Sequence, residues 1–130
     1  MSRCTGRSTP PAGTAGPQAT LRLWEDPASA EILRSIILTA AQEPAAMHRL
    51  RQLFSELVLA VVSHSLPDAE RTLRASLIAT QIVGMVMNRY IWQVGDIATL
   101  PADTVTDLLA PTIQHYLADP LPTKAQRPLA

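Results

Sequence analysis

One helix-forming segment of the sequence, residues 68–94, is apolar on two opposite sides. At 100° per residue, one side of a helix here collects the apolar residues Leu73, Leu77, Met87 and Ile91. The opposite side collects Ile78, Ile82, Met85 and Val86. Because a single amphipathic stripe cannot describe this pattern, the helix needs a partner on each side. We expect one side to pack inside the chain and the other to meet a second copy of it.

Three further helices follow from apolar spacing and from start and stop signals. Asp26-Pro27 predicts a helix start, because Asp caps free backbone N–H groups and Pro at the first helical position has no N–H to leave unpaired. The three helices are predicted over 27–43, 45–64 and 101–118. No stretch alternates convincingly with period two, so the sequence predicts an all-α fold of four helices.

Both ends of the chain are poor in large apolar residues. Met1 is the one sizeable apolar residue within 1–20, and Pro120, Pro122 and Pro128 interrupt the last dozen residues. Such segments cannot bury enough surface to offset the entropy of ordering them. We therefore expect a disordered leader over 1–20, one folded domain over 21–118 and a disordered tail over 119–130.

Charge and cysteine usage argue against several classes of protein. Between residues 21 and 118, seven Arg stand against ten acidic residues, and this net charge of −3 does not suit a phosphate-binding surface. Cys4 is the single cysteine, so no disulfide forms within the chain and the cytoplasm is the expected location. The longest uncharged run, residues 75–88, has 14 residues, short of the roughly 20 that a membrane span needs.

Small residues recur every four positions along the two-sided helix: Ser76, Thr80 and Gly84. Glycine inside a helix costs about 1 kcal/mol relative to alanine, so close approach of another helix would explain Gly84. Two partners for this groove remain open. One is the helix over 45–64 of the same chain, and the other is a second copy.

No pattern for catalysis or metal binding is present. His48, His64 and His115 lie far apart in the sequence, without the spacing of metal ligands. The chain has no nucleophile elbow, phosphate loop or pair of catalytic carboxylates on one helix face. We expect neither an enzyme nor a protein that binds a metal or another cofactor.

Four residues are candidates for lining a ligand pocket: Phe54, Met85, Arg89 and Trp92. Methionine adapts its shape and aromatic rings supply contact area, which suits an apolar ligand, although the same spacing also suits plain core. Arg89 lies on an apolar side of its helix. Its guanidinium must therefore reach water, an acid or a helix-end carbonyl, or contact a ligand.

Several short sequences occur in an order that resembles a known family. They are Leu23-Trp24-Glu25-Asp26-Pro27, Ile32-Leu33-Arg34-Ser35, the run from Gly84 to Arg89-Tyr90, and Leu109-Ala110-Pro111-Thr112-Ile113-Gln114 with Tyr116-Leu117. Together they resemble the C-terminal regulatory domain of tetracycline repressor (TetR) family transcriptional regulators. The resemblance covers about residues 21–118.

The resemblance implies a four-helix bundle with orthogonal and antiparallel packing, which binds a small effector between its helices. It also implies a homodimer formed by the last two helices, over 68–94 and 101–118. The interface residues expected on these helices are Leu77, Thr80, Gly84, Ile91, Leu109, Ile113 and Leu117. We expect a small apolar effector. The alternative is a helical interaction module that dimerises without binding a small molecule.

Members of this family normally begin with a helix-turn-helix domain that reads the DNA major groove. Residues 1–20 cannot form such a domain, so we expect a truncated or free-standing domain that does not contact DNA by itself. A heterodimer with a full-length relative would lack one recognition helix, which would make this chain a dominant-negative partner.

Overall fold

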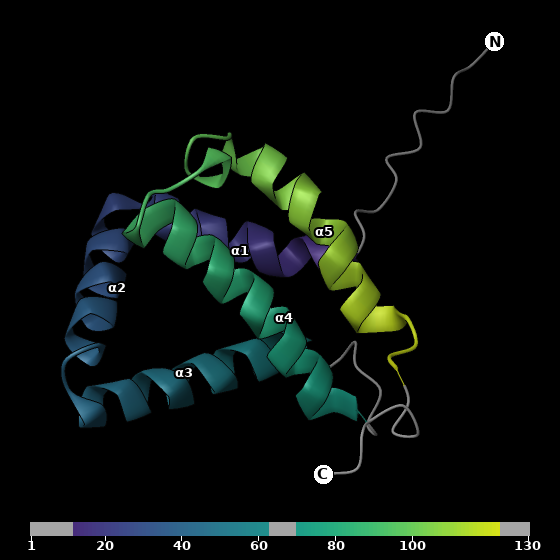
Figure 1. Cartoon of the computed structure of the whole chain (residues 1–130), viewed down its shortest axis with the longest axis horizontal. Helices are drawn as coiled ribbons and strands as arrows, with labels where there is room; N and C mark the ends of the chain where they lie inside the picture. The colour runs from purple at the N-terminus through teal and green to yellow at the C-terminus, as the bar shows by residue number, and fades with distance from the viewer. Residues whose placement is uncertain (1–11, 63–69, 123–130) are drawn as a thin grey trace.

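The computed structural model describes residues 12–62 and 70–122, and these residues form an all-helical domain (Figure 1). The long helices are α1 (Ala15–Glu25), α2 (Pro27–Ala40), α3 (Pro44–Val62), α4 (Arg71–Val86) and α5 (Ala102–Ala118). The short elements are η1 (Ala12–Thr14), the π-helical turn η3 (Met87–Ile91) and η4 (Asp96–Ala98). The predicted all-α fold is confirmed.

The four predicted helices correspond to α2, α3, α4 with η3, and α5, but the predicted number is wrong, because α1 adds a fifth long helix. Asp26 caps α2 as expected, since its Oδ2 accepts hydrogen bonds from the Ser29 backbone N–H at 3.1 Å and from Ser29 Oγ at 2.7 Å. The helix predicted over 68–94, which is α4 with η3, ends earlier than predicted, at Ile91, because Gln93 and Gly95 both take positive φ values. The predicted start of one helix at residue 68 and the predicted end of another at residue 64 lie outside the described residues.

The expected disordered leader is wrong for residues 12–20, which form η1 and most of α1. Gly13 is buried against α5, where its N–H donates to Gln114 Oε1 at 2.8 Å. A Cβ at this position would lie 2.5 Å from the Ala110 carbonyl oxygen, so only glycine permits this approach. Pro17 is also fully buried. Residues 1–11 and 123–130 of the predicted leader and tail lie outside the described residues.

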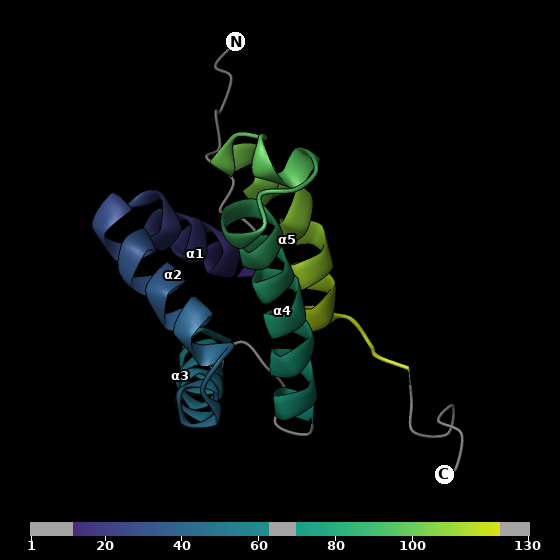
Figure 2. The same ribbon diagram turned by 60° about the vertical axis from the view of Figure 1, so that its left-hand side comes forward.

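The core consists of two clusters that share α4. The first contains Ala75, Ile78 and Ile82 of α4 with Ile113 and Leu117 of α5. The second contains Leu21 and Trp24 of α1, Ala30 of α2, Met85 and Val86 of α4, and Val105 of α5. Helix α4 therefore runs through the middle of the domain, with α2 and α3 on one side and α5 on the other (Figures 1 and 2).

The two predicted apolar sides of α4 have different surroundings. All four residues of one side, Ile78, Ile82, Met85 and Val86, are buried within the chain as expected. On the opposite side, Leu73 is 42% exposed, Leu77 and Met87 are half-buried, and Ile91 packs in part against the second cluster. Packing within the described part of the chain thus buries one side of α4 and leaves the other only partly covered.

Helices α2 and α3 leave some of their apolar residues exposed. Leu33 and Ile37 of α2 pack against the second cluster, whereas Ile32 and Ile36 of the same helix are exposed. Leu53 of α3 is also exposed. Apolar spacing predicted both helices, but only part of their apolar residues is buried.

None of the helices in the described ranges is both long enough and apolar enough to span a lipid bilayer.

We predict that Gly13→Ala destabilises the domain by about 1–3 kcal/mol, because the added methyl group meets rigid backbone of α5. Gly16→Ala is the matched control, since its Cβ would meet only the flexible end of the Ile82 side chain, at 3.3 Å. We expect the control to change the free energy of unfolding by less than about 0.5 kcal/mol. Urea denaturation at fixed protein concentration measures both. Equal stability of the two variants would contradict the close approach at Gly13.

Candidate functional site

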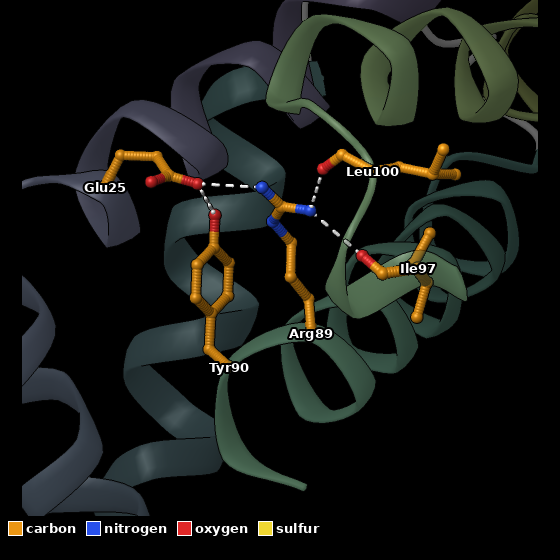
Figure 3. Close-up of polar contacts among 5 residues, drawn as sticks. All are labelled: Glu25, Arg89, Tyr90, Ile97 and Leu100. Carbon is orange, nitrogen blue, oxygen red and sulfur yellow. Dashed lines mark hydrogen bonds and ion pairs between the residues drawn. The ribbon is translucent and has the colours of Figure 1, made fainter. Parts of the chain in front are cut away.

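A polar junction joins the end of α4 to α1 and to the segment before α5 (Figure 3). Oε1 of Glu25, the last residue of α1, accepts hydrogen bonds from Arg89 Nη2 at 3.0 Å and from the Tyr90 hydroxyl at 2.8 Å. Arg89 Nη1 donates to the carbonyl oxygens of Ile97 at 2.9 Å and Leu100 at 2.6 Å. One guanidinium thus connects three parts of the chain.

The sequence left an acid and helix-end carbonyls open as partners for Arg89, and both are present. The Arg89 side chain is 10% exposed, against 49% for Glu25. Arg89 Nε has no hydrogen-bond partner among the described residues. Two carbonyls and a carboxylate nevertheless surround the charge, which compensates for its removal from water.

The π-helical turn η3 presents Arg89 and Tyr90 to this junction. The N–H of Trp92 donates to the Met87 carbonyl at 2.8 Å, five residues back, instead of the usual four. The Asn88 side chain donates to the Gly84 carbonyl at 2.7 Å where the helix changes register. Such turns often occur at functional sites, and here the turn ends the helix beside α1 and α2.

Two further contacts hold Tyr90. Its ring stacks on Trp24 of α1, with centroids 5.2 Å apart and planes 15° from parallel. Its backbone carbonyl accepts a hydrogen bond from Arg34 Nη2 of α2 at 3.3 Å. Residues that carried the family resemblance, namely Trp24, Glu25, Arg34 and the Arg89-Tyr90 pair, therefore meet in one place.

The surroundings of the junction shift the pKa values of Glu25 and Tyr90. Hydrogen bonds from Tyr90 and Arg89 hold the pKa of Glu25 below its usual value of 4.5. Burial, reinforced by the hydrogen bond to the Glu25 carboxylate, raises the pKa of Tyr90 to about 12. Glu25 is therefore ionised and Tyr90 is protonated at neutral pH, which is the arrangement that the hydrogen bonds need.

Sequence reasoning missed a second buried guanidinium, that of Arg74 near the start of α4. This residue is 3% exposed, and its Nη1 donates to the Tyr116 carbonyl of α5 at 2.7 Å. Its Nη2 pairs with Glu70 Oε1 at 3.3 Å. The spacing of Glu70 and Arg74 by four residues was the available signal for the ion pair. Arg74 and Arg89 thus fasten the two ends of α4 to other parts of the chain.

The four candidate pocket residues do not gather in one place. Met85 is buried in the second core cluster, whereas Phe54 packs beside the first. Trp92 is 61% exposed, and Arg89 belongs to the polar junction. Apolar spacing did not reveal that these side chains leave their helices in different directions.

An open hollow of about 570 Å³ runs along α2 instead. Its lining residues are Glu31, Arg34, Ser35, Leu38, Thr39, Gln42 and Glu43. Most of these side chains are polar or charged, unlike the apolar pocket expected from the sequence. Within the described residues, no group of three or more His, Cys, Asp or Glu side chains could hold a metal ion.

The expected interface residues divide between surface and core. Thr80 is exposed to solvent, and four residues are half-buried: Leu77, Gly84, Ile91 and Leu109. Ile113 and Leu117 were expected at the interface, but they are buried in the first core cluster. This is a correction: α5 turns these two residues inward against α4, and it exposes Leu108 instead.

The groove beside Gly84 is open in the described structure. Outside the helix's own backbone, no described atom lies within 4 Å of a Cβ built at Gly84. Phe54 of α3 packs against the first core cluster, on the opposite, buried side of α4. Of the two partners left open by the sequence, α3 of the same chain is therefore not seen in the groove.

Over the described residues the domain is all-helical, and its central helix is only half covered by its own chain. The family model described as "Tetracyclin repressor-like, C-terminal domain" matches residues 12–117. The chain belongs to this family of TetR-type effector-binding and dimerisation domains, whose members are regulatory and typically homodimeric. No curated protein and no solved structure matches the chain.

We predict that Glu25→Gln lowers the free energy of unfolding by about 1 kcal/mol at pH 7, because neutral Gln is a weaker acceptor for Arg89 and Tyr90. The folded-state pKa of Glu25 is depressed, so its contribution is complete above pH 4.5 and is lost as the pH falls below that value. The difference between wild type and variant should therefore shrink in acid.

Denaturation curves at pH 7 and below pH 4.5 measure this difference. Glu56→Gln, at an exposed position on α3, is the control and should change stability little at either pH. A Glu25→Gln difference that stays constant as the pH falls would show that the carboxylate charge does not hold the junction.

Proposed function

We propose that this chain is the effector-sensing and dimerisation domain of a TetR-type transcriptional regulator, and that it forms a homodimer through α4 and α5. The observation that carries the dimer is the uncovered side of α4. Leu73 and Val83 are 42% and 38% exposed there, and the Gly84 groove between them is empty. A second copy packed into this groove would bury these side chains and give the interior glycine a purpose.

Helix α5 contributes its outer side to the proposed interface. Leu108 is 60% exposed on this side, while the residues facing α4 are already buried. Because α5 packs against α4 within the first core cluster, a partner seated on α4 has α5 beside it. Leu77, Thr80, Gly84, Ile91 and Leu109 remain proposed interface residues, with Leu108 replacing Ile113 and Leu117.

We propose no direct contact between this domain and DNA. Residues 21–118 carry a net charge of −3, and an acidic surface opposes approach to phosphates. Operator reading would then be the task of a helix-turn-helix domain. A heterodimer with a full-length regulator of the same family is a further proposed assembly, and co-purification of the two chains tests it.

An interaction module without an effector is the second candidate, because the four predicted pocket residues lie apart. A ligand that binds only the native state stabilises it by RT ln(1 + L/Kd), where L is the free ligand concentration, so thermal stability rises with the logarithm of that concentration above Kd. Thermal-shift measurements with small apolar and small polar compounds therefore separate the two candidates. A stabilisation that grows with ligand concentration in this way supports effector sensing, and no stabilisation by any compound supports the interaction module.

We predict that wild-type protein sediments as a dimer and Gly84→Leu as a folded monomer. Within one chain, a larger side chain at residue 84 meets open space, and leucine favours helix more than glycine does, so the fold should persist. In the dimer, the same side chain would fill the groove and keep the second helix away. Analytical ultracentrifugation measures the mass, and circular dichroism checks helicity.

Ala19→Leu is the matched control, because Ala19 is exposed on α1, a helix that is not part of the proposed interface. It should leave the dimer intact. A wild-type protein that stays monomeric at every concentration would contradict the proposed dimer. Dimerisation of Gly84→Leu as tight as that of the wild type would place the interface elsewhere.

A further inference from the structure

The open hollow on α2 has a lining that can hold both charges of a small molecule. Arg34 supplies a guanidinium, and Glu31, one helical turn away, supplies a carboxylate. Ser35, Thr39 and Gln42 add hydrogen-bonding groups, and Leu38, 53% exposed, adds an apolar surface. These polar side chains are exposed to water, apart from the half-buried Arg34, so a purely apolar ligand would displace water from them without replacing its hydrogen bonds.

The Arg34 guanidinium uses only part of its hydrogen-bonding capacity within the described chain. It makes one hydrogen bond, from Nη2 to the Tyr90 carbonyl at 3.3 Å, and it forms no ion pair with Glu31 or another described carboxylate. A guanidinium has five N–H donors, and its fork fits a carboxylate with two parallel hydrogen bonds. A ligand carboxylate is therefore a stronger partner for Arg34 than the carbonyl it now contacts.

We infer that the hollow on α2 binds a small zwitterion of the amino acid type, whose carboxylate pairs with Arg34 and whose ammonium pairs with Glu31. Glu43, at the far end of the hollow, adds a second negative charge and disfavours ligands that carry only negative charge. An apolar side chain on the ligand would cover Leu38. This inference rests on the proposed effector-sensing function and names its ligand class.

Binding at Arg34 would reach the polar junction directly. The Tyr90 carbonyl belongs to η3, and the same residue's hydroxyl binds Glu25 at the end of α1. When Arg34 turns to the ligand carboxylate, the Tyr90 carbonyl loses this donor, and the turn η3 loses a polar contact with α2. The hollow is thus linked to α1 through two residues, Arg34 and Tyr90.

Isotope-labelled full-length chain titrated by NMR tests this inference, with L-leucine as the probe. Two comparison ligands, here called half-molecules, each keep one charged group of L-leucine. 4-Methylpentanoate keeps only the carboxylate, and 3-methylbutylamine keeps only the ammonium group. We expect saturable shifts of the Ser35 and Thr39 amides and of the Tyr90 and Ile91 amides with L-leucine. Each half-molecule should bind about tenfold more weakly or worse, because a charge-assisted pair is lost.

Arg34→Gln should weaken L-leucine binding about tenfold or more and leave the oligomeric state unchanged. Arg51→Gln, at an exposed position on α3 outside the hollow, is the matched control and should bind as the wild type does. The inference is overturned if L-leucine causes no saturable shift, if Arg34→Gln binds it equally well, or if either half-molecule binds as tightly.

The failure of this inference can be told apart from failure of the proposed function. An apolar compound that stabilises wild type and Arg34→Gln equally would overturn the zwitterion site and support effector sensing elsewhere in the domain. Absence of stabilisation by every compound, polar or apolar, would overturn both.

Discussion

The carboxylate of Glu25 is the point on which the arrangement of helices depends. It receives hydrogen bonds from Arg89 and Tyr90, and Arg89 in turn holds the Ile97 and Leu100 carbonyls. Hydrogen bonds to charged groups contribute about 1.5–3 kcal/mol when well formed, more than neutral ones. They also fix direction, which apolar packing does not. The junction therefore joins the end of α1, the turn η3 and the segment before α5 to one another.

The second constraint is the unequal covering of α4. Its buried side supplies residues to both core clusters, so the helix cannot shift without disturbing the whole core. Its other side keeps exposed leucine and valine beside an empty groove at Gly84. In the proposed homodimer, stability within the chain and association between chains thus depend on opposite sides of one helix. In a family that is typically homodimeric, this division gives the uncovered side a physical purpose.

The sequence predicted what local chemistry determines and missed what distant contacts determine. Asp26-Pro27 marked the start of α2, and the apolar period of α4 separated its buried side correctly. Residues 12–20 appeared unfolded because Gly13 folds against Gln114, 101 residues further along. The scattered pocket residues and the burial of Ile113 have the same origin, since periodicity gives the faces of a helix but not its neighbours.

A double-mutant cycle between Glu25 and Arg89 tests most directly whether the junction organises the domain. The free energies of unfolding of Glu25→Gln, Arg89→Met, the double variant and wild type give the coupling energy between the two side chains. We predict a coupling of at least about 0.5 kcal/mol, because each residue loses its partner when the other is replaced. Additive effects within about 0.3 kcal/mol would contradict the central place of this contact.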